Sequence, residues 1–283
     1  MQFIMFTKHL QTLSIAEMGK VVKDLGFSGV ELTVRAGGHV SPQQVSTDLP
    51  IAIERLADIG LTVPAIVVEI HRPSDPYSEE VCRVAGRLGA TRLRTSSQRY
   101  SVFGALRDEI AAMKKDVADL GRLAADCGVQ ICIHTHSGNF LSAQGAVLAS
   151  IVDGTDPQAI GVSFDLGHLT VEGGLSGWRQ SMELLQGRIG IVAVKSFGWS
   201  VETDLLTDRR NWHPRIVPLR EGNVRWAEGI ALLRQLNWDA DGNALVSLHS
   251  EYQGKETWRD LTVPELIDQT RDDFQWLRGQ AAV

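Results

Sequence analysis

Residues 124–133 read Ala-Ala-Asp-Cys-Gly-Val-Gln-Ile-Cys-Ile, and this stretch predicts the end of a helix followed at once by a strand. Glycine takes the left-handed conformation that closes many helices without steric penalty, so Gly128 is the expected helix stop. The residues from Val129 to Ile133 are mostly apolar and β-branched, which is typical of a buried strand. The stretch therefore predicts a helix-to-strand junction.

The same junction recurs along the chain, with the expected helix-ending glycine at Gly26, Gly60, Gly89, Gly161 and Gly190. Alternation of helix and strand indicates βαβ units and a parallel sheet. A first strand at residues 3–7 and a last at 244–248 bring the expected number of strands to eight. Eight such units predict an α/β fold, a single (β/α)₈ TIM barrel. The missing Gly-x-Gly-x-x-Gly after the first strand counts against a dinucleotide-binding sheet.

The composition indicates one globular domain. The chain has 283 residues, 43% of them hydrophobic, enough for one barrel core, so we expect a single domain over residues 1–283. A formal net charge of −6 counts against a nucleic-acid partner, and no apolar run is long enough for a membrane span. The three cysteines lack metal-site spacing and suit a reducing compartment, and we see no signal peptide, so we expect a cytoplasmic protein.

Polar side chains fall on the inner parity of the strands, late in each strand. Side chains alternate between the two faces of a strand, and in a barrel one face looks into the lumen. In the last strand, Ser247, His249 and Glu251 alternate with Val246 and Leu248. Five other strands place polar residues on the same parity, at Glu31, Thr33 and Arg35, at Glu69 and His71, at His134 and His136, at Ser163 and Asp165, and at Lys195. Strand carboxyl ends form the active-site face of a TIM barrel, so a polar mouth is predicted there.

The histidines support this prediction because all eight fall at a strand end or in the loop that follows, and none falls in an expected helix. We expect His134, Asp165 and His249 to project inward at comparable heights. Two imidazoles and a carboxylate suit a divalent metal ion with open positions for substrate oxygens, one of Mn, Zn, Co, Ni or Mg. The alternative is a buried Asp–His hydrogen-bond network without metal.

Three further residues are candidate catalytic groups. Glu251, in a partly desolvated mouth, could act as a general base or a fourth ligand, and otherwise forms a salt bridge at the rim. Lys195 could stabilise a developing enolate, and otherwise pairs with Asp165 or Glu251. His168, three residues past Asp165, could contact a polyol or exchange a proton, and otherwise orders the loop.

Other polar and aromatic residues near the expected mouth are candidates for substrate binding. Arginine side chains bind hydroxyl, carboxylate and phosphate groups, and aromatic faces pack on sugar rings. The candidates are His9, Arg35, His71, Arg94, His136 and Trp199. For each of them a purely structural role is the alternative.

An ordered set of motifs resembles the xylose isomerase-like TIM barrel superfamily, also called the sugar phosphate isomerases and epimerases. The motifs are Gly26-Phe-Ser-Gly-Val-Glu-Leu, His136-Ser-Gly, Phe164-Asp-Leu-Gly-His168, Pro218-Leu-Arg-Glu-Gly-Asn-Val and Ser247-Leu-His-Ser-Glu-Tyr252. The resemblance runs over nearly the whole chain. It implies a divalent metal held by glutamate, aspartate, histidine and glutamate from strands five to eight. This sequence keeps the aspartate, Asp165, and has His134, Ala193 and His249 at the other three positions.

The resemblance and the inner polar residues together favour an enzyme that moves a proton next to the carbonyl of a sugar or keto-sugar, an isomerase or epimerase. One alternative is a lyase or dehydratase acting on a keto-sugar or polyol at the same mouth. Another is a non-catalytic carbohydrate-binding barrel without metal. The expected partner is a small carbohydrate, and the sequence is compatible with a homo-oligomer.

Overall fold

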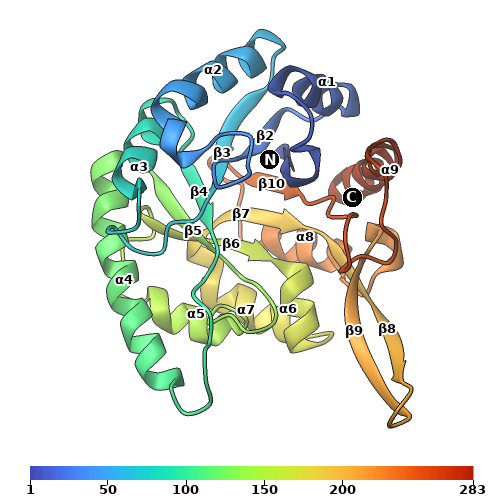
Figure 1. The fold of residues 1–283 in the computed structure, drawn as a ribbon. Helices are drawn as coiled ribbons and strands as arrows, with labels where there is room; N and C mark the ends of the chain where they lie inside the picture. The colour runs from blue at the N-terminus through green and yellow to red at the C-terminus, as the bar shows by residue number, and fades with distance from the viewer. Residues whose placement is uncertain (283) are drawn as a thin grey trace.

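The computed structural model describes residues 1–282, in which eight parallel strands close into a barrel with helices around it (Figure 1). The barrel strands are β1 (Gln2–Phe6), β2 (Gly29–Thr33), β3 (Thr62–Val68), β4 (Arg92–Thr95), β5 (Gln130–His134), β6 (Ile160–Asp165), β7 (Ile189–Val194) and β10 (Leu245–Leu248). Around the ring they follow the order β1-β10-β7-β6-β5-β4-β3-β2. The predicted (β/α)₈ barrel is confirmed.

The helices connect successive strands and cover the outside of the barrel (Figure 1). They are α1 (Ile15–Leu25), α2 (Val45–Asp58), α3 (Ser78–Arg87), α4 (Leu106–Cys127), α5 (Gly145–Val152), α6 (Leu166–Gly173), α7 (Gly177–Leu185), α8 (Trp226–Gln235) and α9 (Val263–Ala282). Local sequence fixes the bounds of α1: Ser14 and Glu17 form a capping box at its start, and Gly26 ends it at φ 90°. Within residues 1–282 no helix has the length and apolar character needed to cross a membrane.

The prediction of helix-ending glycines is right at Gly128 and wrong at Gly161 and Gly190. Gly128 follows α4 at φ 67°, whereas Gly161 lies in β6 and Gly190 in β7. A Cβ at either strand position would collide with the side chain of Gln130. These two glycines therefore make room for Gln130 and do not turn the chain.

The lumen changes from apolar to polar along the strands. Ile4, Ala65, Cys132, Ile191 and Leu245 form a buried apolar cluster of their own, separate from the core between strands and helices. Toward the carboxyl ends, the inner positions carry buried polar side chains, namely Ser163, Asp165, Lys195, Ser247 and His249. The strand β3 departs from the predicted alternation because it ends at Val68 and Glu69 is exposed beyond it. The apolar cluster supports the polar side chains from below.

A β-hairpin interrupts the repeat after β7. Its strands β8 (Ser196–Asp204) and β9 (Arg209–Val217) pair with each other in antiparallel register and form a separate two-stranded sheet. The hairpin extends away from the barrel (Figure 1). It begins directly after Lys195, so its base stands beside the mouth of the barrel.

Candidate active site

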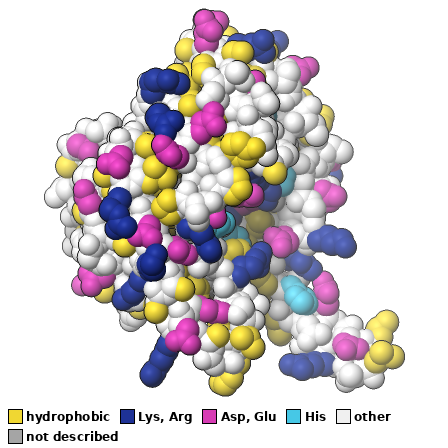
Figure 2. All heavy atoms as spheres, turned by 60° about the vertical axis from the view of Figure 1, so that its left-hand side comes forward, with side chains coloured by type: hydrophobic (Ala, Val, Ile, Leu, Met, Phe, Trp, Pro, Cys, Tyr) yellow, Lys and Arg dark blue, Asp and Glu magenta, His cyan; other side chains and the backbone are white. Residues whose placement is uncertain are grey.

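A cavity of about 800 Å³ opens at the carboxyl ends of the strands. Its lining combines barrel residues with the hairpin: Lys8, His9, His136, His168, Lys195, Glu251, His213 and Arg215 are among the residues that form its wall. Figure 2 shows histidine side chains in the recess between the barrel and the hairpin. Of the residues predicted to act in the site, five line this cavity, namely His9, His136, His168, Lys195 and Glu251.

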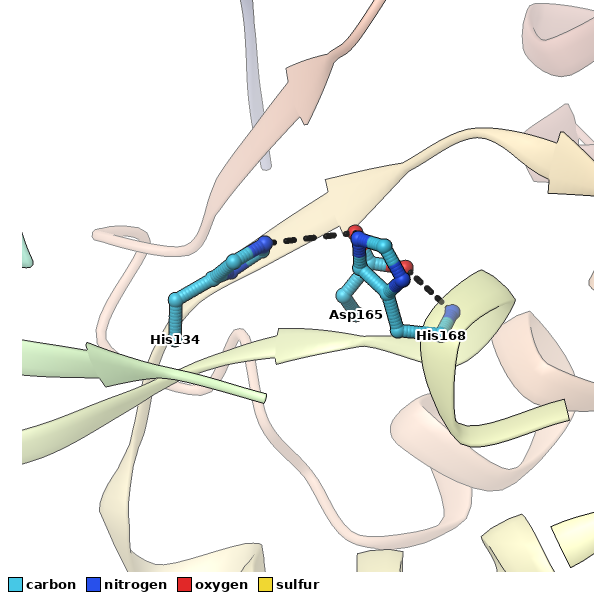
Figure 3. A group of neighbouring side chains, drawn as sticks. All are labelled: His134, Asp165 and His168. Atoms are coloured by element: carbon cyan, nitrogen blue, oxygen red, sulfur yellow. Dashed lines mark hydrogen bonds and ion pairs between the residues drawn. The ribbon is translucent and has the colours of Figure 1, made fainter. Parts of the chain in front are cut away.

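Asp165 is the centre of a buried cluster at this end of the barrel (Figure 3). It ends β6 and caps α6, where its Oδ1 accepts the backbone N–H of His168 at 2.9 Å. Its other oxygen, Oδ2, lies 3.6 Å from His134 Nε2 and 4.0 Å from His168 Nε2. The first turn of α6 therefore brings His168 back over the carboxylate that caps it, while His134 approaches from the end of β5.

The three side chains fit a divalent metal ion. One ligand atom from each of His134, Asp165 and His168 lies within 4.8 Å of the other two. Asp165 Oδ2 and His168 Nε2 are buried and have no hydrogen-bond partner. Burial lowers the pKa of both imidazoles well below the usual value, helped by the charge of Lys195, so both are neutral as metal ligation requires.

Hydrogen bonds on the far side of each imidazole orient it toward Asp165. Ser163 Oγ lies 3.1 Å from His134 Nδ1, and Ser137 Oγ lies 2.8 Å from His168 Nδ1. With both Nδ1 atoms engaged, the Nε2 atoms remain for a shared ligand. The structure thus places His168, which was predicted to be catalytic, in the cluster where His249 was expected.

A buried lysine lies on the other side of Asp165. Lys195 Nζ is 3.4 Å from Asp165 Oδ2 and donates to Glu251 Oε2 at 2.6 Å. Burial alone would lower the pKa of Lys195, but Glu251 and Asp165 raise it above the usual value, so the amine stays charged. A charged group in this position competes with a metal ion for Asp165.

Glu251 is held between two lysines. Its Oε1 accepts from Lys8 Nζ at 2.8 Å, and its Oε2 from Lys195. Burial tends to raise the pKa of the carboxyl, but Lys195 and Lys8 bring it well below the usual value. Glu251 is therefore ionised at the wall of the cavity.

His249 belongs to a second buried network inside the barrel. Its Nε2 lies 3.2 Å from Glu31 Oε2, which also accepts from Ser247 Oγ at 2.7 Å, and Arg94 Nε donates to Glu31 Oε1 at 2.5 Å. The remaining His249 nitrogen, Nδ1, has no partner and is 3.9 Å from Glu251 Oε2. Because Glu31 holds its Nε2, His249 stands beside Glu251 and outside the metal-compatible cluster.

Two more predicted residues contact the cavity through its rim. The ring of His136 stacks on that of His168 with centroids 3.9 Å apart, and its Nδ1 bonds the carbonyl oxygen of Ser137. His9 Nδ1 bonds Gln253 Oε1 at 3.0 Å, and its Nε2 has no partner. His9 therefore keeps one buried nitrogen without a hydrogen-bond partner beside the cavity.

Four residues predicted to bind substrate do not line the cavity. His71 bonds Ser96 and sits in a separate shallow depression. Arg94 is committed to Glu31, Arg35 is half-buried after β2, and Trp199 lies on the outer part of β8, 48% exposed. His71 and Arg94 thus have partners outside the cavity, and Arg35 and Trp199 are not among the residues that line it.

No role was predicted for Glu31 or for the hairpin residues His213 and Arg215. Glu31 stood on the inner parity of its strand, so its burial was foreseeable, but its partner Arg94 comes from a strand that is not adjacent. The hairpin was detectable from the alternation of Phe197, Trp199 and Val201 with polar residues.

The chain is similar in sequence to one characterised enzyme and in fold to several solved structures. It is 24% identical to the inosose dehydratase of Bacillus velezensis over 163 residues, and the match spans 53% of this chain and 52%, about half, of that relative. The D-psicose 3-epimerase of Clostridium cellulolyticum H10, solved with D-tagatose, superposes with a TM-score of 0.71 at 14% identity, over 99% of both chains. A xylose isomerase-like TIM barrel protein from Mycobacterium smegmatis, solved with magnesium, has a TM-score of 0.64 at 19% identity, over 96% of this chain and 92% of that one.

At these identities the solved structures show the shared fold. The family assignment rests on the sequence profile of xylose isomerase-like TIM barrels, which matches residues 20–280. That range includes every barrel strand from β2 onward and the whole Asp165 cluster. The chain therefore belongs to the xylose isomerase-like TIM barrel family.

Proposed function

We propose that this protein is an isomerase or epimerase that moves a proton on the carbon next to the carbonyl of a keto-sugar. The observation that carries the proposal is the contact of charged Lys195 with two carboxylates, Glu251 and Asp165, at the wall of a polar cavity. A cation and a carboxylate side by side can stabilise an enediolate oxygen and accept the carbon-bound proton. The epimerase with a similar fold supports a sugar as the substrate.

In this proposal Glu251 is the base. Its low pKa is set by Lys195 and Lys8, and a carboxylate held so low is a weak base. When Lys195 turns its Nζ from Glu251 to the substrate oxygen, the carboxylate loses one of these partners, so its pKa rises. The same movement places positive charge where the enediolate oxygen develops. Substrate binding thus activates both groups together.

His168 is the candidate for the second proton transfer. It is neutral because burial lowers its pKa, and its Nε2 has no partner in the cavity. Ser137 fixes the ring through Nδ1, and His136 stacks on it. A neutral imidazole that lines the same cavity as Glu251 can take the hydroxyl proton of an enediol and then return a proton to the substrate.

A divalent ion is the alternative partner for this cluster, with His134, Asp165 and His168 as its ligands; bound through His168 Nε2, it would take the place of His168 in proton transfer. Bound there, it would supply Lewis-acid polarisation of the substrate carbonyl. The Asp165 carboxylate would then interact with both the ion and the charged amine of Lys195. Asp165 Oδ2 and His168 Nε2, which are both buried without a hydrogen-bond partner, support this assignment.

Dehydration is the second candidate function, favoured by the partial match to an inosose dehydratase. The first step is the same removal of a proton next to a carbonyl. The outcome then depends on whether a hydroxyl group at the β position is expelled, with His168 as the acid that protonates it. Both reactions use Glu251 and Lys195 in the same roles.

Incubation of the protein with a panel of keto-sugars and keto-polyols in D₂O, followed by NMR, tests the proposal. We expect deuterium at the carbon next to the carbonyl together with an isomeric product; an unsaturated product would establish dehydration instead. The variants Glu251→Gln and Lys195→Met should each lower the rate at least ~100-fold. His71→Gln, outside the cavity, should retain the wild-type rate. Sugar binding without exchange or product would overturn the proposal.

A further inference from the structure

The hairpin is amphipathic, and its apolar face is exposed. Trp199, Val201 and Trp212 share one face, because Val201 pairs with Trp212 and Trp199 lies two residues before Val201. They are 48%, 45% and 62% exposed, and Leu205 and Leu206 at the turn are 95% and 96% exposed. Figure 2 shows hydrophobic side chains gathered at the end of the hairpin, at the lower right.

The opposite face of the hairpin is polar and belongs to the cavity. Arg215 donates to Glu202 at 2.5 Å, and His213 Nε2 lies 3.7 Å from the other oxygen of Glu202. Both His213 and Arg215 line the cavity, whereas Trp199, Val201 and Trp212 do not. At the base of the apolar face, Pro214 also reaches the cavity, but the exposed aromatic and aliphatic side chains farther out on that face do not.

The outer part of the hairpin has little support from the rest of the chain. Its base is anchored where Phe197 and Ile216 are buried and Ile216 bonds the segment around Thr257. Beyond that point the side chains of both strands are partly or fully exposed. A two-stranded hairpin is marginally stable in water unless another layer packs on it.

We propose that a second copy of this chain provides that layer, in a two-fold dimer whose hairpins pack with their apolar faces together. The five exposed apolar side chains offer roughly 450 Å² per chain. Two copies thus cover roughly 900 Å² of apolar surface, and since about 60% of an interface is apolar, the full contact is about 1,500 Å². That is the size of a standard stable interface.

A two-fold axis is expected because both chains would contribute the same surface, the apolar face of the hairpin. In an isologous contact the same patch serves both partners, so a patch that is apolar on one chain meets an apolar patch on the other. Tryptophan residues at the centre of such a patch supply most of the binding energy. Packing of this kind would also fix the hairpin that carries His213 and Arg215 beside the cavity.

Sedimentation velocity across micromolar concentrations tests the proposal. We expect wild type to sediment with twice the 31.0 kDa mass of one chain. Trp212→Lys and the double variant Leu205→Ser/Leu206→Ser should each raise the dimer Kd at least ~30-fold, the change expected for a central contact residue. Phe103→Lys, which removes a side chain that is 97% exposed on the barrel, should leave the dimer intact.

Circular dichroism and thermal melting of each variant separate loss of association from loss of folding. A folded, monomeric Trp212→Lys protein beside a dimeric Phe103→Lys protein supports the proposal. A monomeric wild type would overturn it. So would a dimer that persists in both hairpin variants, because the interface would then lie elsewhere.

Discussion

Replacement of Arg94 by methionine removes the strongest partner of a charge buried inside the barrel. Glu31 is fully buried, and Arg94 holds it through a hydrogen-bonded ion pair at 2.5 Å. Burial alone would raise the pKa of Glu31, but Arg94 and His249 lower it from 4.5 to about 2. The variant leaves this carboxylate with Ser247 and His249 only.

The expected cost is about 3 kcal/mol at neutral pH. Breaking a buried ion pair from one side costs about 3–5 kcal/mol, and the remaining hydrogen bonds place this case at the low end. The lowered pKa of Glu31 gives a similar figure, about 3 kcal/mol. Because the pKa is lower in the folded state, this stability is present above pH 4.5 and is lost as the pH falls toward 2. Arg94→Met should therefore also weaken the pH dependence in that range.

Urea unfolding at neutral and acidic pH measures both effects. The double variant Glu31→Gln/Arg94→Met should recover part of the loss, since it removes both charges. Arg83→Met, which breaks an exposed pair with Glu79 on α3, is the control and should change stability by less than about 0.5 kcal/mol. If Arg94→Met costs no more stability than Arg83→Met, the buried ion pair does not stabilise the barrel as proposed.

Two further predictions concern parts of the fold outside the site. Burial raises the pKa of Asp273 to about 6, even though its carboxylate accepts a hydrogen bond from Tyr252. The protein should therefore lose about 3 kcal/mol of stability as the pH rises from 3.8 through 6, because Asp273 must ionise while buried. Asp273→Asn should remove this loss from the pH profile of urea unfolding, and an unchanged profile would contradict the prediction. Gly161→Ala should destabilise the barrel by about 1–3 kcal/mol, because the added Cβ meets the side chain of Gln130. Gly187→Ala is the control and should leave the stability unchanged, because the space around Gly187 is open. Equal melting temperatures of the two variants would show that Gln130 moves aside at little cost.

Local signals in the sequence predicted the barrel because they act over a few residues. A glycine after a helix and a short apolar run identify each helix-to-strand junction, as at Gly128. The same signal failed at Gly161 and Gly190 because their small size serves a contact with Gln130, which only the closed barrel brings near. A single glycine can therefore end a helix or make room for a neighbouring side chain, and the sequence alone does not distinguish these two roles.

Strand parity predicted which side chains face inward, and it brought His134 and Asp165 to one place. It could not give the third member of that cluster, because α6 starts at once after β6 and returns His168 over Asp165. His249 was equally well placed by parity, but Glu31, from a strand far away in sequence, engages it. Which of the inward-facing residues join the cluster around Asp165 therefore depends on hydrogen bonds and ion pairs across the lumen, between strands that are distant in sequence.

Asp165 joins the two halves of the proposed active site, since it contacts both the His134–His168 pair and Lys195. Titration with Mn²⁺, followed by electron paramagnetic resonance, tests this in wild type, Asp165→Asn and the control His71→Gln. We predict one tightly bound ion per chain in wild type and control, and affinity at least ~100-fold weaker in Asp165→Asn. Wild type that binds no ion, or an Asp165→Asn variant that binds it as tightly as wild type, would show that Asp165 does not organise a metal site.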